Sequence, residues 1–66
     1  MEDKTKLLIA VAASFATNCE PCLKTTLDSA RKSGVEEKEI LAAIGIARSV
    51  KKGASANIDR LASTML

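Results

Sequence analysis

The chain contains no histidine, tryptophan or tyrosine, and Phe15 is its only aromatic residue. Without histidine, any acid–base group must be Glu, Asp or Lys, and a metal site would have no imidazole ligand. Hydrophobic residues make up 47% of the 66 positions, but alanine, which buries little area, is the commonest of them. With so few large side chains, the small core of a single chain is only weakly stabilised. We therefore expect one domain, residues 1–66, that gains stability by self-association.

Charge of one sign is also scarce, because ten basic residues are set against eight acidic ones and the net charge is only +2. The basic residues are scattered along the chain, and no aromatic residues lie among them to stack on bases. Nucleic acid is therefore not an expected partner.

Long hydrophobic runs are absent as well. The longest covers Leu7–Ala13, whereas a membrane-spanning helix needs about 20 apolar residues, so no membrane partner is expected. The residues before it mix acidic and basic side chains, which is untypical of a signal peptide. With no export signal, we expect a cytoplasmic protein. In that reducing compartment a CxxC pair is more often catalytic or metal-binding than structural.

The pattern of apolar residues predicts helices throughout. No segment alternates polar and apolar residues as a strand does, and no Asn-Gly or Asp-Gly hairpin turn occurs. The expected fold class is all-α, with about four helices joined by tight turns. These helices are expected at about Asp3–Ala16, from Asn18 to just before Gly34, at Glu36–Lys51 and at Ala54–Thr64. The first is apolar almost all round, which indicates burial against another chain.

Several residues mark the expected helix ends. Asn18 is predicted to cap the N-terminus of the second helix, and Gly34 to follow its last turn in the left-handed conformation. Val35 and Ile40 have the spacing of a hydrophobic staple across the start of the third helix. Gly53 is predicted to end that helix.

Basic residues gather near the expected end of the third helix. Arg48, Lys51 and Lys52 follow a first turn that is rich in glutamate. Both placements suit the helix dipole, so we expect these basic residues to compensate the dipole of their own helix. The alternative is a site for an anionic partner.

The two cysteines, Cys19 and Cys22, open the second helix as a CxxC pair. Unpaired N–H groups and the positive end of the dipole favour a thiolate there, and cysteines so placed can have pKa values lowered from about 8.5 to roughly 3.5–7.5. The spacing puts both sulfurs on one side of the first turn. One sulfur could attack a substrate and the other could resolve the product into a disulfide. Pro21 stiffens this turn.

Two other interpretations of the pair remain open. Cysteine often packs as a small hydrophobe, and both positions fall on a stripe that continues through Leu23, Thr26, Leu27 and Ala30. Alternatively, two sulfurs form half of a tetrahedral metal site, which a second chain would have to complete with its own Cys19 and Cys22.

The segment "NCEPC" followed by "ARKSGVEEKEILAAIGIA" resembles the alkylhydroperoxidase D-like branch of the carboxymuconolactone decarboxylase family, over about Leu8 to Val50. The resemblance implies an all-helical homo-oligomer, commonly a trimer or hexamer. It implies that the thiols reduce peroxide or exchange disulfides, with electrons from a reductant that the sequence does not identify. It also implies that Cys22 attacks peroxide and that Cys19 is the resolving, more accessible cysteine. No cofactor is expected.

The chain departs from this family at two positions. Where the family carries a histidine four residues after the second cysteine, this chain has Thr26, and where it carries a glutamate on the preceding helix, this chain reads Leu7-Leu8-Ile9. A threonine hydroxyl donates a hydrogen bond but is no base near neutral pH, so peroxidase activity should be weakened. Disulfide exchange needs less assistance.

The function we expect is therefore that of a thiol–disulfide oxidoreductase or alkylhydroperoxidase-like antioxidant protein. Its catalytic residues would be Cys22 and Cys19, supported by Thr26, Asn18 and Pro21. The alternative is a non-enzymatic oligomer whose CxxC pair binds metal at a subunit interface or only packs.

Overall fold

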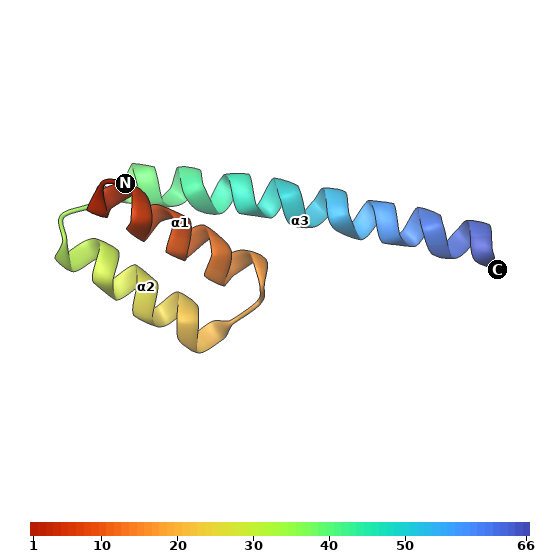
Figure 1. Cartoon of the computed structure of the whole chain (residues 1–66), viewed down its shortest axis with the longest axis horizontal. Coiled ribbons are helices and arrows are strands. Elements are labelled where there is room, and N and C mark those ends of the chain that lie inside the picture. Colours follow the sequence, from red (N-terminus) through yellow and green to blue (C-terminus); the bar gives the residue numbers. More distant parts are fainter.

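The computed structural model describes all 66 residues as three α-helices without a strand. They are α1 (Asp3–Ala16), α2 (Glu20–Lys32) and α3 (Glu37–Met65), shown in Figure 1. α1 packs against both other helices, whereas α2 and α3 barely touch. The second half of α3 projects beyond this body and stretches the molecule to 49 × 20 × 20 Å. The all-α prediction is thus confirmed.

The prediction of a fourth helix is wrong, because α3 continues through Gly53 to Met65. A glycine inside a helix costs only about 1 kcal/mol relative to alanine, and no proline follows to break the hydrogen-bond ladder. Arg48, Lys51 and Lys52 therefore lie in the middle of α3, and its last turn contains no basic residue. Compensation of the dipole of their own helix is consequently excluded for them.

The predicted cap of α2 is also wrong by one residue. Cys19, with extended φ and ψ of −90° and 97°, is the N-cap. Asn18 instead has a left-handed φ of 58° and closes α1: its N–H bonds to the Phe15 carbonyl at 3.2 Å, and the Cys19 N–H bonds to the Ser14 carbonyl at 3.1 Å. This is a Schellman ending with asparagine in the place that glycine usually takes. Asparagine tolerates the left-handed region better than most residues.

The end of α2 follows the prediction. Gly34 has a φ of +83°, its N–H bonds to the Arg31 carbonyl, and the Val35 N–H bonds to the Ala30 carbonyl, both at 3.0 Å. These two bonds form a second Schellman ending. The chain then enters α3 at Glu37, with Val35 and Ile40 in one buried cluster, as the staple predicted.

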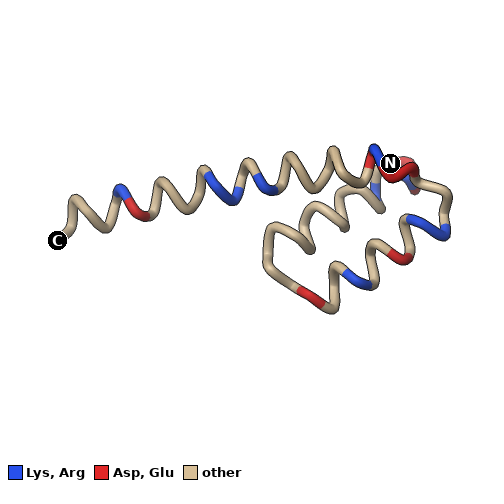
Figure 2. Tube along the Cα trace, turned by 180° about the vertical axis from the view of Figure 1, so that it is seen from behind, with Lys and Arg blue, Asp and Glu red and all other residues tan.

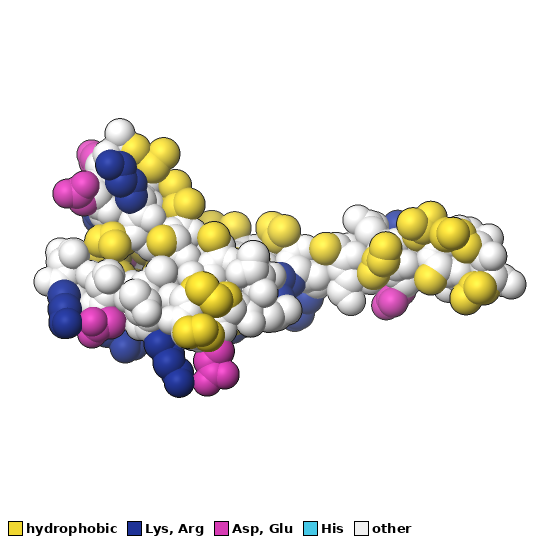
Figure 3. All heavy atoms as spheres, turned by 60° about the horizontal axis from the view of Figure 1, so that its bottom comes forward, with side chains coloured by type: hydrophobic (Ala, Val, Ile, Leu, Met, Phe, Trp, Pro, Cys, Tyr) yellow, Lys and Arg dark blue, Asp and Glu magenta, His cyan; other side chains and the backbone are white.

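The core of the single chain is small. Only six residues are buried, and the central cluster consists of Val11, Ala30, Val35 and Ile40. Many large hydrophobic side chains stay exposed, and Figure 3 shows a group of them on the projecting half of α3. On that half the exposed large hydrophobic residues are Ile58, Leu61, Met65 and Leu66. No helix combines the length and the apolar composition that a membrane span requires.

Substituting alanine at two glycines should change stability in opposite directions. A Cβ at Gly34 would meet no atom within 4 Å, so Gly34→Ala destabilises through its left-handed backbone alone, by about 1 kcal/mol. Gly53 lies in an open helical position, so Gly53→Ala should stabilise by up to about 1 kcal/mol. Urea unfolding followed by far-UV circular dichroism measures both. A break in α3 at residue 53 would be indicated if Gly53→Ala destabilised the protein.

Candidate redox site at the α1–α2 junction

The two cysteines are joined as a disulfide at the start of α2. Their Cα atoms are 5.2 Å apart, inside the usual range for bonded cysteines. As the N-cap residue, Cys19 places its sulfur 3.3 Å from the backbone nitrogen of Cys22, whose N–H it accepts. Cys22 is the third residue of the helix and Pro21, the second, has no N–H, so this is the hydrogen bond that an N-cap side chain makes.

The exposure of the two cysteines differs from the expected inward stripe. Cys22 is exposed and Cys19 is half-buried, which is the reverse of the accessibility that the resemblance implies. Glu20 and Pro21 are exposed as well, so no element of the chain covers the first turn of α2. The stripe faces inward only from Leu23 onward.

The hydrogen-bond partners of Thr26 are groups other than the disulfide. Its hydroxyl lies 3.2 Å from the carbonyl oxygen of Leu23 and 3.4 Å from the hydroxyl oxygen of Ser14, and it can donate its one proton to either. Ser14 is buried and donates in turn to the carbonyl of Ala10 at 2.7 Å. Thr26 therefore links α2 to α1, and no hydrogen bond joins it to a sulfur.

Lys51 is the residue near the site that the sequence did not reveal. Its ammonium donates to the side-chain oxygen of Asn18 at 2.6 Å and to the backbone carbonyl of Phe15 at 3.1 Å. It also lies 4.5 Å from the centre of the Phe15 ring, on which Arg48 stacks at 5.3 Å. Lys51 thus neutralises the C-terminal carbonyl end of α1 instead of that of its own helix. Figure 2 shows basic positions in the middle of α3, where the helix passes the α1–α2 turn.

A pocket of about 240 Å³ lies at this junction. We call it the Cys19 pocket, and its lining residues are Ser14, Phe15, Asn18, Cys19, Glu20, Leu23 and Lys51. Of the expected site residues it brings together Cys19 and Asn18, whereas Cys22, Pro21 and Thr26 lie outside it. The carboxylate of Glu20 is paired with Lys24 at 3.2 Å. Chemically, the pocket presents a sulfur with a cation on one side.

A metal site is not assembled by one chain. No group of three or more Cys, Asp or Glu side chains lies close enough to hold an ion, and both sulfurs are bonded to each other. The expected alternative of a metal at a subunit interface would need reduced cysteines from two chains.

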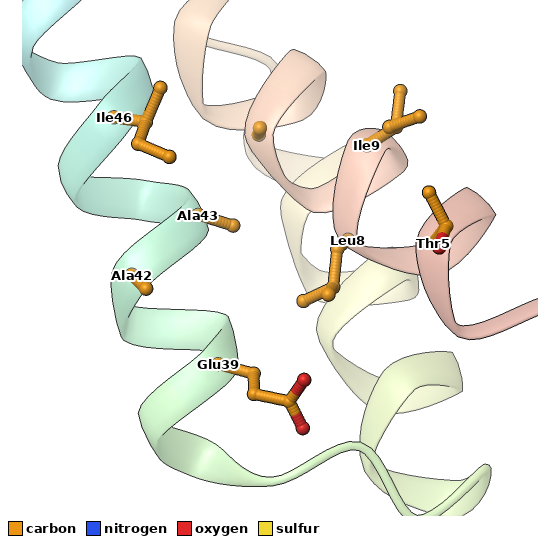
Figure 4. Close-up of a pocket in the computed structure, with 8 residues that line it drawn as sticks. Thr5, Leu8, Ile9, Glu39, Ala42, Ala43 and Ile46 are labelled. Carbon is orange, nitrogen blue, oxygen red and sulfur yellow. The ribbon is translucent and has the colours of Figure 1, made fainter.

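A larger apolar groove of about 370 Å³ runs between α1 and α3 (Figure 4). It is lined by Thr5, Leu8, Ile9, Ala12, Glu39, Ala42, Ala43 and Ile46. Glu39 closes one end by an ion pair with Lys4 at 2.7 Å, and this hydrogen bond raises the pKa of Lys4. Six of its eight lining residues are hydrophobic, so the groove is a mainly apolar surface.

The fold and the site together define a small all-α protein with a CxxC disulfide at a helix start. The chain belongs to the carboxymuconolactone decarboxylase family, whose family model matches residues 1–62. It is also similar to a Paracoccus denitrificans protein described as uncharacterized protein 4 in the cox locus, with 34% identity over 55 residues. The aligned part is 83% of this chain but only half of that relative. No solved structure matches the chain with significance.

Replacing Thr26 should lower the unfolding free energy without changing the reactivity of the two cysteines. Thr26→Val keeps the shape but removes the hydroxyl that bridges α1 and α2, so we expect a loss of about 1 kcal/mol in unfolding free energy. Thr25→Val, at the exposed neighbouring position, should change stability by less than about 0.5 kcal/mol. Alkylation rates of the reduced cysteines should match the parent in both variants. Slower alkylation of Thr26→Val without a loss of stability would show that Thr26 does act on a sulfur.

Proposed function

We propose that this chain is a thiol–disulfide oxidoreductase whose working pair is Cys19 and Cys22. The observation that carries the proposal is the disulfide itself, formed at the N-terminus of a helix by one exposed and one half-buried cysteine. A disulfide in this position is reachable by another molecule. Its reduced form also gains from the N–H groups and the dipole of α2, which favour a thiolate.

The exchange proceeds in two steps. In the reduced protein one thiolate attacks a sulfur of a substrate disulfide, forms a mixed disulfide and releases the first substrate thiolate. The other cysteine, once deprotonated, attacks the protein sulfur of that mixed disulfide, releases the second substrate thiolate and forms the Cys19–Cys22 bond. Two electrons pass to the substrate, and the two thiol protons are taken up by the two products. A cellular thiol reductant reverses these steps and regenerates the dithiol.

Disulfide exchange is a better proposal for this site than peroxide reduction. The only hydrogen bond to either sulfur comes from a backbone amide, which cannot relay protons, and Thr26 bonds elsewhere. General acid–base assistance is typically worth about 10²–10⁴-fold in rate, so its absence weakens the peroxidase. We place the protein in the cytoplasm, where thiol reductants regenerate the dithiol.

The proposal is tested by mixing the reduced protein with a small disulfide such as hydroxyethyl disulfide. The parent should form the intramolecular bond, seen by intact mass as the loss of two hydrogens, and release two thiols per chain. Neither Cys19→Ser nor Cys22→Ser can close the bond, so either variant should stop at a mixed disulfide. Oxidation of the parent no faster than that of free cysteine in the same buffer contradicts the proposal. Stoichiometric zinc or iron in the purified reduced protein would instead support the metal alternative.

We further propose that the protein works as a homo-oligomer, of which a trimer or hexamer is the form that the family resemblance favours. The small core and the apolar groove leave much apolar surface uncovered. The projecting half of α3 packs on no other part of the chain (Figure 1), and it exposes large hydrophobic side chains to water. Its exposed stripe, Ile58, Leu61 and Met65, therefore needs a partner surface.

Light scattering coupled to size exclusion measures the assembly. Leu61→Glu should raise the dissociation constant at least about tenfold, because a buried leucine contributes about 1.5–3 kcal/mol. Ser63→Glu adds the same charge on the opposite face of the helix and should leave the assembly intact. A monomeric parent at micromolar concentration, or equal effects of both changes, would contradict an oligomer built through this stripe.

A further inference from the structure

The hydrogen bond that caps α2 distinguishes the two cysteines from each other. Cys19 occupies the N-cap and accepts the Cys22 N–H at 3.3 Å, whereas no hydrogen bond reaches the sulfur of Cys22. On reduction this N–H faces the sulfur of Cys19, and a hydrogen bond to an ionised acceptor is roughly twice as strong as a neutral one. The positive end of the α2 dipole acts at the same place. Both effects favour ionisation of Cys19 over Cys22.

The C-terminal end of α1 opposes that ionisation. The Cys19 N–H bonds to the Ser14 carbonyl, so the sulfur-bearing residue directly follows the negative end of the α1 dipole. Lys51 offsets this end by donating to the Phe15 carbonyl at 3.1 Å, and its bond to Asn18 at 2.6 Å holds the ammonium beside the residue that precedes Cys19. Lys51 and Cys19 line the same pocket.

The other ionisable groups at the pocket do not cancel this cation. From α2, Glu20 lines the pocket but is paired with Lys24. Arg48 of α3 does not line the pocket, but it stacks on the ring of Phe15, which does, and so adds a second positive charge nearby. α1 contributes only Ser14 and Phe15, neither of which titrates. The charge near Cys19 is therefore positive on balance, which favours its thiolate.

We propose that Cys19 is the attacking thiol and Cys22 the resolving one, and that Lys51 is the positioning residue that holds positive charge at the Cys19 pocket. The inference rests on the proposed function, since it assigns roles within the same exchange. The thiolate of Cys19 attacks the substrate disulfide, and the exposed Cys22 then attacks the sulfur of Cys19. This order is the opposite of the order that the resemblance to the family implies.

Single-cysteine variants separate the two thiols. Iodoacetamide alkylation, followed by mass spectrometry across pH, measures Cys19 in Cys22→Ser and Cys22 in Cys19→Ser. We expect the midpoint for Cys19 to lie at least about one pH unit below that for Cys22. In the reduced parent, peptide mapping after limited alkylation should find the label first on Cys19, which checks the result without any substitution.

The role of Lys51 is tested in the Cys22→Ser background. Lys51→Met should raise the alkylation midpoint of Cys19 and slow its reaction at neutral pH about threefold to tenfold, because an opposite charge is lost. Lys51→Arg should restore most of the reactivity. Lys52→Met, at the exposed neighbouring position, is the matched control and should match the parent. Added salt should shrink the effect of Lys51→Met through screening, which a merely structural role would not do.

The possible outcomes keep this inference apart from the proposed function. Earlier ionisation of Cys22, with the pair still cycling, overturns the assignment of roles but leaves disulfide exchange standing. An unchanged midpoint in Lys51→Met overturns the part assigned to Lys51. Failure of the reduced parent to oxidise with a disulfide overturns the proposed function itself, whichever thiol ionises first.

Discussion

The arrangement of the molecule depends on one residue that ends one helix and begins the next. The N–H of Cys19 completes the Schellman ending of α1, and its side chain caps α2. With Asn18 in the left-handed conformation, these bonds turn the chain back on itself within a few residues. They determine where the sulfur lies relative to both helices. They also expose the terminal carbonyls of α1 to a cation from α3.

Opposed helix ends meet at this turn, and their electrostatics explain why α3 takes part in the site. The carbonyl end of α1 disfavours an anion, while the amide end of α2 attracts one. Lys51 bonds to the Phe15 carbonyl and to Asn18. Its positive charge thereby offsets the negative carbonyl end of α1, which would otherwise disfavour a thiolate. α3, which supplies the buried residues Ile40 and Ala47, thus also supplies a positive charge to the site. The same side chain ties α3 to the end of α1.

The sequence predicted those features that local chemistry controls. The end of α2 at Gly34 followed from the one residue type that adopts a positive φ without cost, and the CxxC pair followed from its spacing. Asn18 was misassigned because asparagine suits both a helix N-cap and a left-handed helix ending, and a single sequence offers no means to choose. Gly53 was misassigned because a glycine weakens a helix without ending it.

The contact made by Lys51 could not be predicted, because it joins residues 33 and 36 positions apart that no periodicity connects. The double part played by Cys19 also has a consequence for how such a scaffold could change. Serine is among the strongest N-cap residues, and the backbone bond from residue 19 to the Ser14 carbonyl does not involve the side chain. Replacing Cys19 by serine would therefore keep the N-cap of α2 and the ending of α1 but remove the disulfide. Descendants of this protein that had lost the redox reaction in this way would still fold.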